Sequence, residues 1–168
     1  VSPTTDMTYW VTASTGLCTA WDQVMVFVNT PPVADAGPGQ AACYGEIATF
    51  TASGGSEYLW STGDTTASTN VIAISSGYYT VTVSDGICEA TDSAFLDVIP
   101  LPNVDVTDTA YTCPGSSVTL TVSGASSYIW EDGSTGSTYT FTPVSDTVIH
   151  VTGYELGCSN TDSSIVII

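Results

Sequence analysis

The chain has 168 residues and a formal charge of -17, because its 17 carboxylates are balanced by no lysine or arginine. Nucleic-acid binding needs cations that neutralise phosphate, and anionic lipid headgroups repel a surface of this sign, so both classes of partner are excluded. The missing lysine also excludes Schiff-base chemistry and phosphate-binding P-loops. No apolar run approaches the roughly 20 residues of a membrane span.

An internal period of 70 residues organises the chain. Cys18, Cys88 and Cys158 lie one period apart, and Cys43 and Cys113 repeat the interval. A constant period is the signature of a tandem array. We therefore expect the C-terminal part of a repeat over residues 1–30, followed by whole repeats over 31–100 and 101–168.

Residues 1–30 predict two strands. One carries Tyr9 and Val11 on one face, and the other carries Val24, Val26 and Val28 on one face. Apolar residues at every second position are typical of a half-buried strand. The junction over residues 29–32 contains two prolines, which favour an extended and stiff connector.

Repeat 31–100 predicts strands over residues 48–52, 58–60, 79–83 and 94–98, with a turn at 61–64. After a second proline junction at 99–102, repeat 101–168 predicts the same strands over 118–122, 128–130, 149–151 and 164–168. Val, Ile, Thr and Tyr recur in these short runs between Gly, Ser, Asp and Pro, and no segment has helical spacing.

The fold class that these elements predict is all-β. Trp60 coincides with Trp130 when the repeats are superimposed, so both are expected in a core. About seven short strands in 70 residues, with a central tryptophan and bracketing cysteines, are typical of a small immunoglobulin-like β-sandwich. The chain is then a series of such sandwiches, each stabilised by one disulfide.

The cysteine spacing suggests how those disulfides pair. Cys43 and Cys88 are 45 residues apart, as are Cys113 and Cys158, which fits one bond within each repeat. Closing such a loop contributes about 4 kcal/mol in the chain-entropy model. Cys18 is then expected to pair with a cysteine upstream of the given sequence. The alternative is a bond between chains through Cys18.

Two sequence motifs resemble a known family. The first is the segment that runs from Cys43-Tyr-Gly-Glu to Tyr-Leu-Trp-Ser-Thr-Gly-Asp, together with its counterpart from Cys113-Pro-Gly-Ser to Tyr-Ile-Trp-Glu-Asp-Gly. The second is the closing Tyr79-Thr-Val-Thr-Val-Ser-Asp-Gly-Ile-Cys88. They are similar to the immunoglobulin-like and PKD-like repeats of giant cell-surface adhesins of Bacteroidota. That resemblance implies export by the type IX secretion system, an extracellular location, and a role in surface filaments, adhesion or gliding. The family usually carries some lysine, and this sequence has none.

No catalytic or metal motif emerges from the sequence. His150 is the single histidine and is interpreted as a structural or surface residue, and the cysteines lack the paired spacing of a zinc site. We therefore expect no enzymatic activity and no cofactor. Calcium stays open, because Asp105 and Asp108, or Asp35, lie near the junctions and could share an ion. Solvated charge is the alternative interpretation.

Two further sets of residues are candidates for specific roles. Asp22, Asp92 and Asp162 share one phase and are expected to hold a turn by accepting backbone N–H bonds. Short Asp-Ser/Thr-small triplets resemble the O-glycosylation motif of Bacteroidota, and their acceptors are Thr65, Ser93, Thr109 and Thr147.

The leading functional hypothesis is a structural and adhesive repeat region, which acts as a semi-rigid stalk of a surface filament. Its partners would be neighbouring repeats of the same chain, a homo-oligomeric fibre formed by strand pairing, or a glycan or protein ligand at the cell surface. The alternative is a carbohydrate-binding or spacer module of a secreted hydrolase, which would bind sugar through exposed aromatics such as Trp10 or Trp21.

Overall fold

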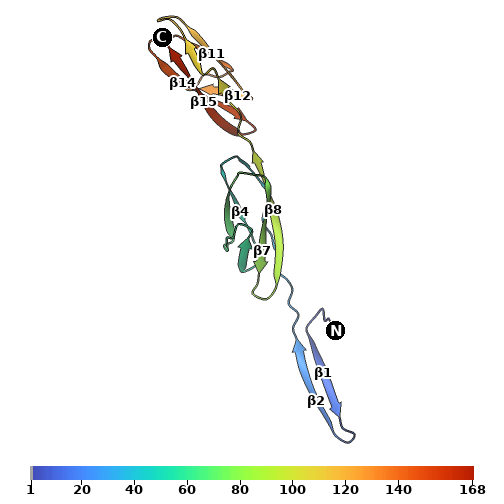
Figure 1. Cartoon of the computed structure of the whole chain (residues 1–168). Coiled ribbons are helices and arrows are strands. Elements are labelled where there is room, and N and C mark those ends of the chain that lie inside the picture. The colour runs from blue at the N-terminus through green and yellow to red at the C-terminus, as the bar shows by residue number, and fades with distance from the viewer. Residues whose placement is uncertain (1) are drawn as a thin grey trace. The chain divides into compact units, whose positions relative to one another are not determined.

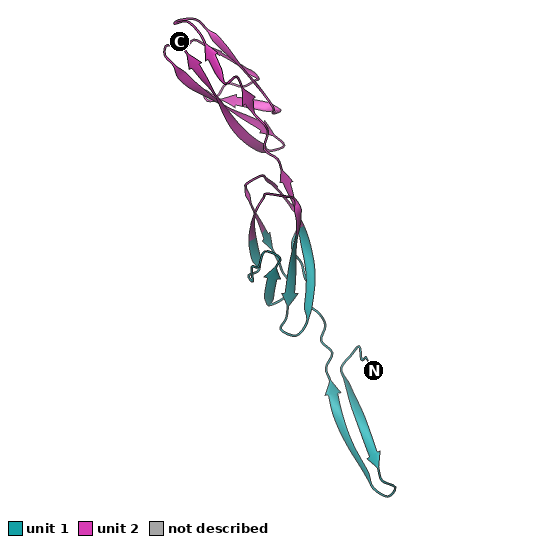
Figure 2. Cartoon of the chain, in the orientation of Figure 1, with its two compact units in different colours: residues 1–37, 50–69, 79–94 teal, residues 38–49, 70–78, 95–168 magenta. Residues whose placement is uncertain are grey.

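A computed structural model describes residues 2–168 of the chain, and in that range it contains strands and no helix. Contacts divide the chain into two compact units (Figure 2). The first comprises residues 1–37, 50–69 and 79–94, and the second comprises residues 38–49, 70–78 and 95–168. The repeat over 31–100 therefore contributes to both units.

The chain begins with a two-stranded hairpin, drawn in blue in Figure 1. Strands β1 (Met7–Ser14) and β2 (Thr19–Val26) pair antiparallel, with Tyr9 opposite Val24 and Val11 opposite Asp22. The hairpin has the apolar face that the sequence predicts, but Val11 is 63% exposed and Val24 is 60% exposed. The hairpin is thus a sheet whose apolar face is uncovered.

The next repeat contains six strands in two sheets. The larger sheet has the order β3-β8-β7-β5, in which β3 runs parallel to β8, and the smaller one pairs β4 with β6. The strands are β3 (Gln40–Cys43), β4 (Ile47–Thr51), β5 (Glu57–Trp60), β6 (Ser68–Ile72), β7 (Gly77–Ser84) and β8 (Glu89–Ile99).

The C-terminal repeat has the same plan. One sheet has the order β10-β15-β14-β12, with β10 parallel to β15, and the other has the order β13-β11-β9. The strands are β9 (Asp105–Val106), β10 (Thr109–Tyr111), β11 (Val118–Ser123), β12 (Ser127–Trp130), β13 (Thr138–Phe141), β14 (Thr147–Glu155) and β15 (Cys158–Ile167). Figure 1 shows β11 on the opposite side of this repeat from β14 and β15.

The core of the C-terminal repeat forms between its two sheets. Its buried members alternate along their strands, and they include Leu120, Trp130, Val151 and Val166. Tyr139 stacks on Trp130 with ring centroids 5.1 Å apart, which extends the core toward β13. Fully burying each large apolar side chain stabilises the fold by roughly 1.5–3 kcal/mol, so this cluster is the main source of stability.

The first compact unit contains an aromatic cluster of its own, in which Trp60 corresponds to Trp130. Phe50 is 1% exposed and Trp60 is 2% exposed, and their ring centroids are 6.3 Å apart. Tyr79 stacks on Phe50 at 5.4 Å. Val81 and Val83 of β7 are fully buried. The alternating residues that the sequence placed on one face are therefore those that face the core.

Gly54 and Gly124 show why a glycine recurs at one position of the repeat. Both have positive φ, at 107° and 92°. A Cβ on Gly54 would lie 1.8 Å from the carbonyl oxygen of Val33, and a Cβ on Gly124 would lie 1.9 Å from that of Asn103. No other residue fits this approach of two backbones, so the glycine fixes how each repeat begins.

Candidate functional site

The feature of the molecule that stands out chemically is a disulfide between Cys43 and Cys158, with Cα atoms 5.6 Å apart. Cys43 ends β3, where its Cα pairs with that of Ile99 at the end of β8. Cys158 opens β15, directly after the β14–β15 turn, and is 1% exposed. The bond therefore joins the repeat over 31–100 to the repeat over 101–168.

This bond shows that the predicted pairing of Cys43 with Cys88, and of Cys113 with Cys158, is wrong. Cys88 directly precedes the 11-residue strand β8, whereas Cys43 lies beside the last residue of that strand. At about 3.3 Å per residue the two are roughly 35 Å apart, and a disulfide needs Cα atoms about 4.4–6.8 Å apart. Cys88 lies next to the start of β8, and Cys43 lies beside its end.

The same geometry separates Cys113 from Cys158. Thr112 donates its backbone N–H to the carbonyl of Ile167 at 3.0 Å, so Cys113 lies at the end of β15, whereas Cys158 lies at its start. The spacing could not reveal this. Cysteines that repeat every 70 residues leave open whether the first cysteine of a repeat pairs within its own repeat or with the next one.

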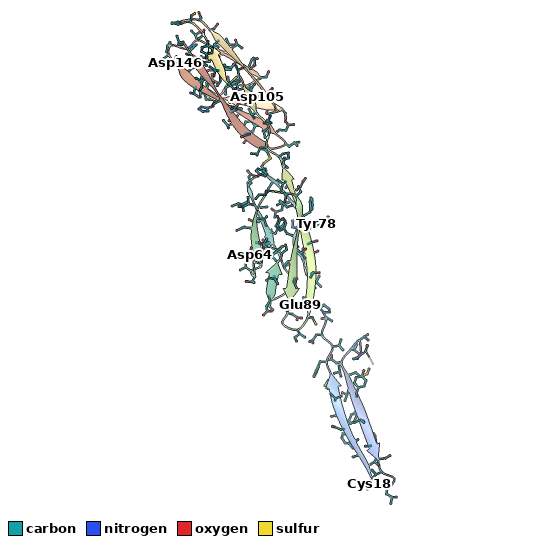
Figure 3. All side chains as sticks on the ribbon, viewed as in Figure 1. Cys18, Asp64, Tyr78, Glu89, Asp105 and Asp146 are labelled. Atoms are coloured by element: carbon teal, nitrogen blue, oxygen red, sulfur yellow. A yellow bond between two sulfur atoms is a disulfide. The ribbon has the colours of Figure 1, made fainter. Side chains whose placement is uncertain are left out.

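Three cysteines carry no disulfide among residues 2–168. Cys18 and Cys113 are exposed, and Cys88 is half-buried. Figure 3 labels Cys18 at the tip of the β1–β2 hairpin. Cys18 and Cys88 occupy the hairpin position that Cys158 has in the last repeat, and Cys113 occupies the position of Cys43. The partner of Cys18 upstream of the sequence stays a prediction.

Trp60 and Trp130 lie in the core, and each indole forms the same hydrogen bond. Trp60 Nε1 donates to the carbonyl of Thr66 at 3.1 Å, and Trp130 Nε1 donates to that of Gly136 at 3.0 Å. Each indole thereby satisfies its buried N–H while holding the loop that follows its strand. The donors of these two hydrogen bonds lie 70 residues apart, and so do their acceptors.

The periodic aspartates accept backbone N–H bonds, but from the start of the repeat and not from a local turn. Asp92 Oδ2 accepts from Ala36 and Asp162 Oδ2 accepts from Val106, both at 2.9 Å. The Ala36 amide, followed by that of Ser93, holds the pKa of Asp92 below its ordinary value. Each carboxylate therefore ties the opening segment of a repeat to its last strand.

Asp22, in the same phase, makes a different contact. It accepts the adjacent N–H of Gln23 at 2.8 Å. The residue that would correspond to Ala36 or Val106 lies before the first residue of the sequence. Asp22 therefore lacks the contact with an opening segment that Asp92 and Asp162 make.

The two tryptophans of the hairpin are exposed on its other face. Trp10 is 61% exposed and Trp21 is 67% exposed, and their ring centroids are 5.2 Å apart. Tyr9, on the face that corresponds to the core, is half-buried. Trp10 and Trp21 thus form an exposed aromatic pair on the described hairpin.

The remaining candidate residues lie on the surface and do not form a cluster. His150 is exposed, as are Thr65, Ser93 and Thr109, whereas Thr147 is half-buried. Within residues 2–168, no group of three or more His, Cys, Asp or Glu side chains is arranged to hold a metal ion. Asp35 accepts the N–H of Gly37 at 2.9 Å. No helix long and apolar enough to cross a membrane occurs in this range.

Paired sheets around a buried tryptophan, with a parallel strand at one edge, define tandem immunoglobulin-like β-sandwich repeats. No protein-family model and no curated protein matches the sequence. Solved structures that resemble the chain include the titin domains Z1Z2 in complex with telethonin, at 17% identity and a TM-score of 0.37 over 84% of this chain and 98% of that one.

Two other structures in this group are longer. The eight N-terminal immunoglobulin domains of DSCAM match at 16% identity and a TM-score of 0.41, over 96% of this chain and 30% of that one. The insect immune protein hemolin matches at 15% identity and a TM-score of 0.44, over 95% of this chain and 55% of that one. The chain thus spans about a third and about half of these two solved chains.

Proposed function

We propose that the chain is a structural and adhesive repeat region of a secreted cell-surface filament or adhesin, in which it acts as a semi-rigid stalk. The observation that carries this proposal is the Cys43–Cys158 bond, which ties one repeat to the next. Such bonds persist in oxidising compartments outside the cytosol. Together with the sequence motifs, this supports an extracellular protein similar to the Bacteroidota adhesins exported by type IX secretion.

Small-angle X-ray scattering of the full chain tests the stalk. The oxidised protein should give a narrower distribution of interatomic distances than the reduced protein, because the disulfide limits motion about the junction at residues 100–103. Cys158→Ser should behave like the reduced protein under both conditions. The same scattering curve before and after reduction would contradict a stiffening role.

The uncovered hairpin supports assembly as part of the same proposal. Residues equivalent to Val11 and Val24 are buried in the following repeat, where Val81 is fully buried and Ala94 is 3% exposed. A further sheet, from the same polypeptide or from a second copy in a fibre, would cover this face. Sedimentation velocity over a range of protein concentrations distinguishes these sources, since fibre assembly alone depends on concentration.

A second candidate function is a carbohydrate-binding or spacer module of a secreted hydrolase. The exposed Trp10–Trp21 pair favours it, because aromatic faces stack on sugar rings. Binding on a glycan array that is lost in Trp10→Ala and Trp21→Ala, and kept in Tyr78→Ala, would support this function. Absence of binding by the unmodified chain would exclude the carbohydrate-binding role.

Glycosylation of the Asp-Ser/Thr-small triplets and calcium binding near the junctions are tested separately, with an unmodified surface and solvated charge as the alternatives. Tandem mass spectrometry of peptides from the native protein should show glycan additions at Thr65, Ser93 and Thr109 more than at half-buried Thr147. Bound calcium should raise the melting temperature more than sodium chloride of equal ionic strength does. An equal effect of the two salts would assign the acidic residues to solvated charge.

A further inference from the structure

We infer that the Cys43–Cys158 bond is one member of a series, and that Cys113 forms the next member with the hairpin cysteine of an adjoining repeat. This series of bonds goes beyond the stalk role, and it does not depend on whether the chain belongs to a filament or to an adhesin. It rests on two structural equivalences. One concerns the first cysteine of each repeat, and the other concerns the hairpin cysteine.

Cys113 has the local structure of Cys43. Ala41 pairs with Asp97, and Tyr111 pairs with Ile167 in the same parallel register one period later. After the strand, the carbonyls of Cys43 and Cys113 accept the N–H of Glu46 and Ser116 respectively, both at 3.0 Å. Because the backbone around the two cysteines is the same, Cys113 presents its thiol at the end of its repeat as Cys43 does.

Cys18 and Cys88 have the local structure of Cys158. Each follows a tight turn, and its strand partner lies three residues earlier. Glu155 pairs with Cys158, Asp85 donates its N–H to the carbonyl of Cys88 at 3.3 Å, and Thr15 donates to that of Cys18 at 2.9 Å. These cysteines are hairpin thiols, which pair with the first cysteine of a preceding repeat.

The observed bond supplies the pairing rule. A first cysteine bonds a hairpin cysteine 115 residues further along, which lies in the next repeat. Applied to Cys113, the rule places the partner in the repeat that adjoins residue 168 in an array of the same period. A second copy, which carries Cys18 on the open β1–β2 hairpin, presents the same kind of thiol.

The reaction is a thiol–disulfide exchange with an oxidised dithiol protein or a small-molecule disulfide. The two thiols lose two protons and two electrons and form one S–S bond, and the donor disulfide is reduced to two thiols. The consequence is a set of overlapping covalent loops, in which each repeat is bonded to both of its neighbours.

The test uses the full chain and an extended chain, in which a copy of residues 99–168 follows residue 168 in frame. Thr161→Ser in the added copy marks its hairpin peptide by mass. Both proteins are oxidised in a glutathione buffer and alkylated. They are then digested with proteases that cut at Glu and Asp, since the sequence offers trypsin no site.

In the extended chain we expect a peptide that links Cys113 to the hairpin cysteine of the added copy, with loss of alkylation at Cys113. In the full chain, a covalent dimer that links Cys113 to Cys18 would assign the partner to a second copy. An intact Cys43–Cys158 peptide shows in each case that the repeats are folded, and Cys113→Ser is the control that keeps it. The inference is overturned if Cys113 is alkylated in both proteins, or bonds another Cys113.

Discussion

The indole of Trp130 is among the largest fully buried side chains of the protein, and it contacts the core, Tyr139 and the loop at Gly136 at once. Its neighbour Ile129 lies on the other face of β12 and is 43% exposed. The two residues therefore form a matched pair in one strand, one facing the core and one facing away from it.

Trp130→Ala should lower the free energy of unfolding by about 3–5 kcal/mol, because it leaves a cavity and two groups without their partner. Ile129→Ala should change it by about 0.5 kcal/mol or less. Urea unfolding followed by circular dichroism measures both. Similar effects of the two substitutions would show that β12 does not bury Trp130 in the protein in solution.

The hydrogen bond that Asp92 accepts should make the free energy of unfolding depend on pH. The folded pKa of Asp92 lies below the ordinary value because it accepts the Ala36 amide, so its contribution is present above the unfolded pKa near 3.8 and is lost as pH falls through the folded pKa. Asp92→Asn should lower the urea midpoint at pH 7, and the difference from the unsubstituted chain should shrink on acidification. Glu89→Gln removes one charge from the same repeat as a control. A difference that persists at low pH would contradict this account.

The β1–β2 hairpin and the C-terminal hairpin β14–β15 differ in whether their apolar face is covered. The sequence gives β1–β2 and β14–β15 equivalent positions, but β14–β15 lies in a four-stranded sheet with its apolar face covered, whereas β1–β2 stands as a two-stranded sheet. An isolated hairpin is marginally stable in water. The environment of the two elements, and not their pattern, decides their stability.

Backbone amides of β1 and β2 should exchange with deuterium much faster than those of β14 and β15. Mass-spectrometric hydrogen exchange at neutral pH compares the two hairpins within one molecule, so solution conditions are the same for both. Equal protection would mean that another part of the protein, or a second copy, already covers the hairpin.

The elements also show what the sequence could and could not reveal. Alternating Val, Phe and Leu residues and the period of 70 were sufficient to predict the longer strands, the buried tryptophans and their faces, since these follow from local pattern. The short strands β3, β6, β9, β10 and β13 were not located, because their few residues carry too little alternation. The Cys43–Cys158 bond and the Asp92–Ala36 contact join positions 115 and 56 residues apart. Because the spacing is identical in every repeat, the sequence fits a partner in the same repeat and a partner in the next one equally well. Only the folded structure shows which residues lie at the same end of a strand.

The whole molecule carries a charge of one sign. With no lysine or arginine, carboxylates repel one another across the surface, and there are few ion pairs for salt to weaken. The melting temperature should therefore rise as sodium chloride increases from about 0.01 M to about 1 M, which shortens the screening length from about 30 Å to about 3 Å. Potassium chloride should act equally. Differential scanning calorimetry measures the shift, and a fall in melting temperature would contradict repulsion as the dominant effect.

The bond between Cys43 and Cys158 also determines how the polypeptide bears tension. A pull on the two ends passes from Cys43 to Cys158 through the sulfur atoms, so the intervening backbone carries no load while the bond is intact. The 115-residue separation corresponds to roughly 400 Å of contour length. Chemical reduction would release that reserve, and the protein would change from a short tether to an extensible one.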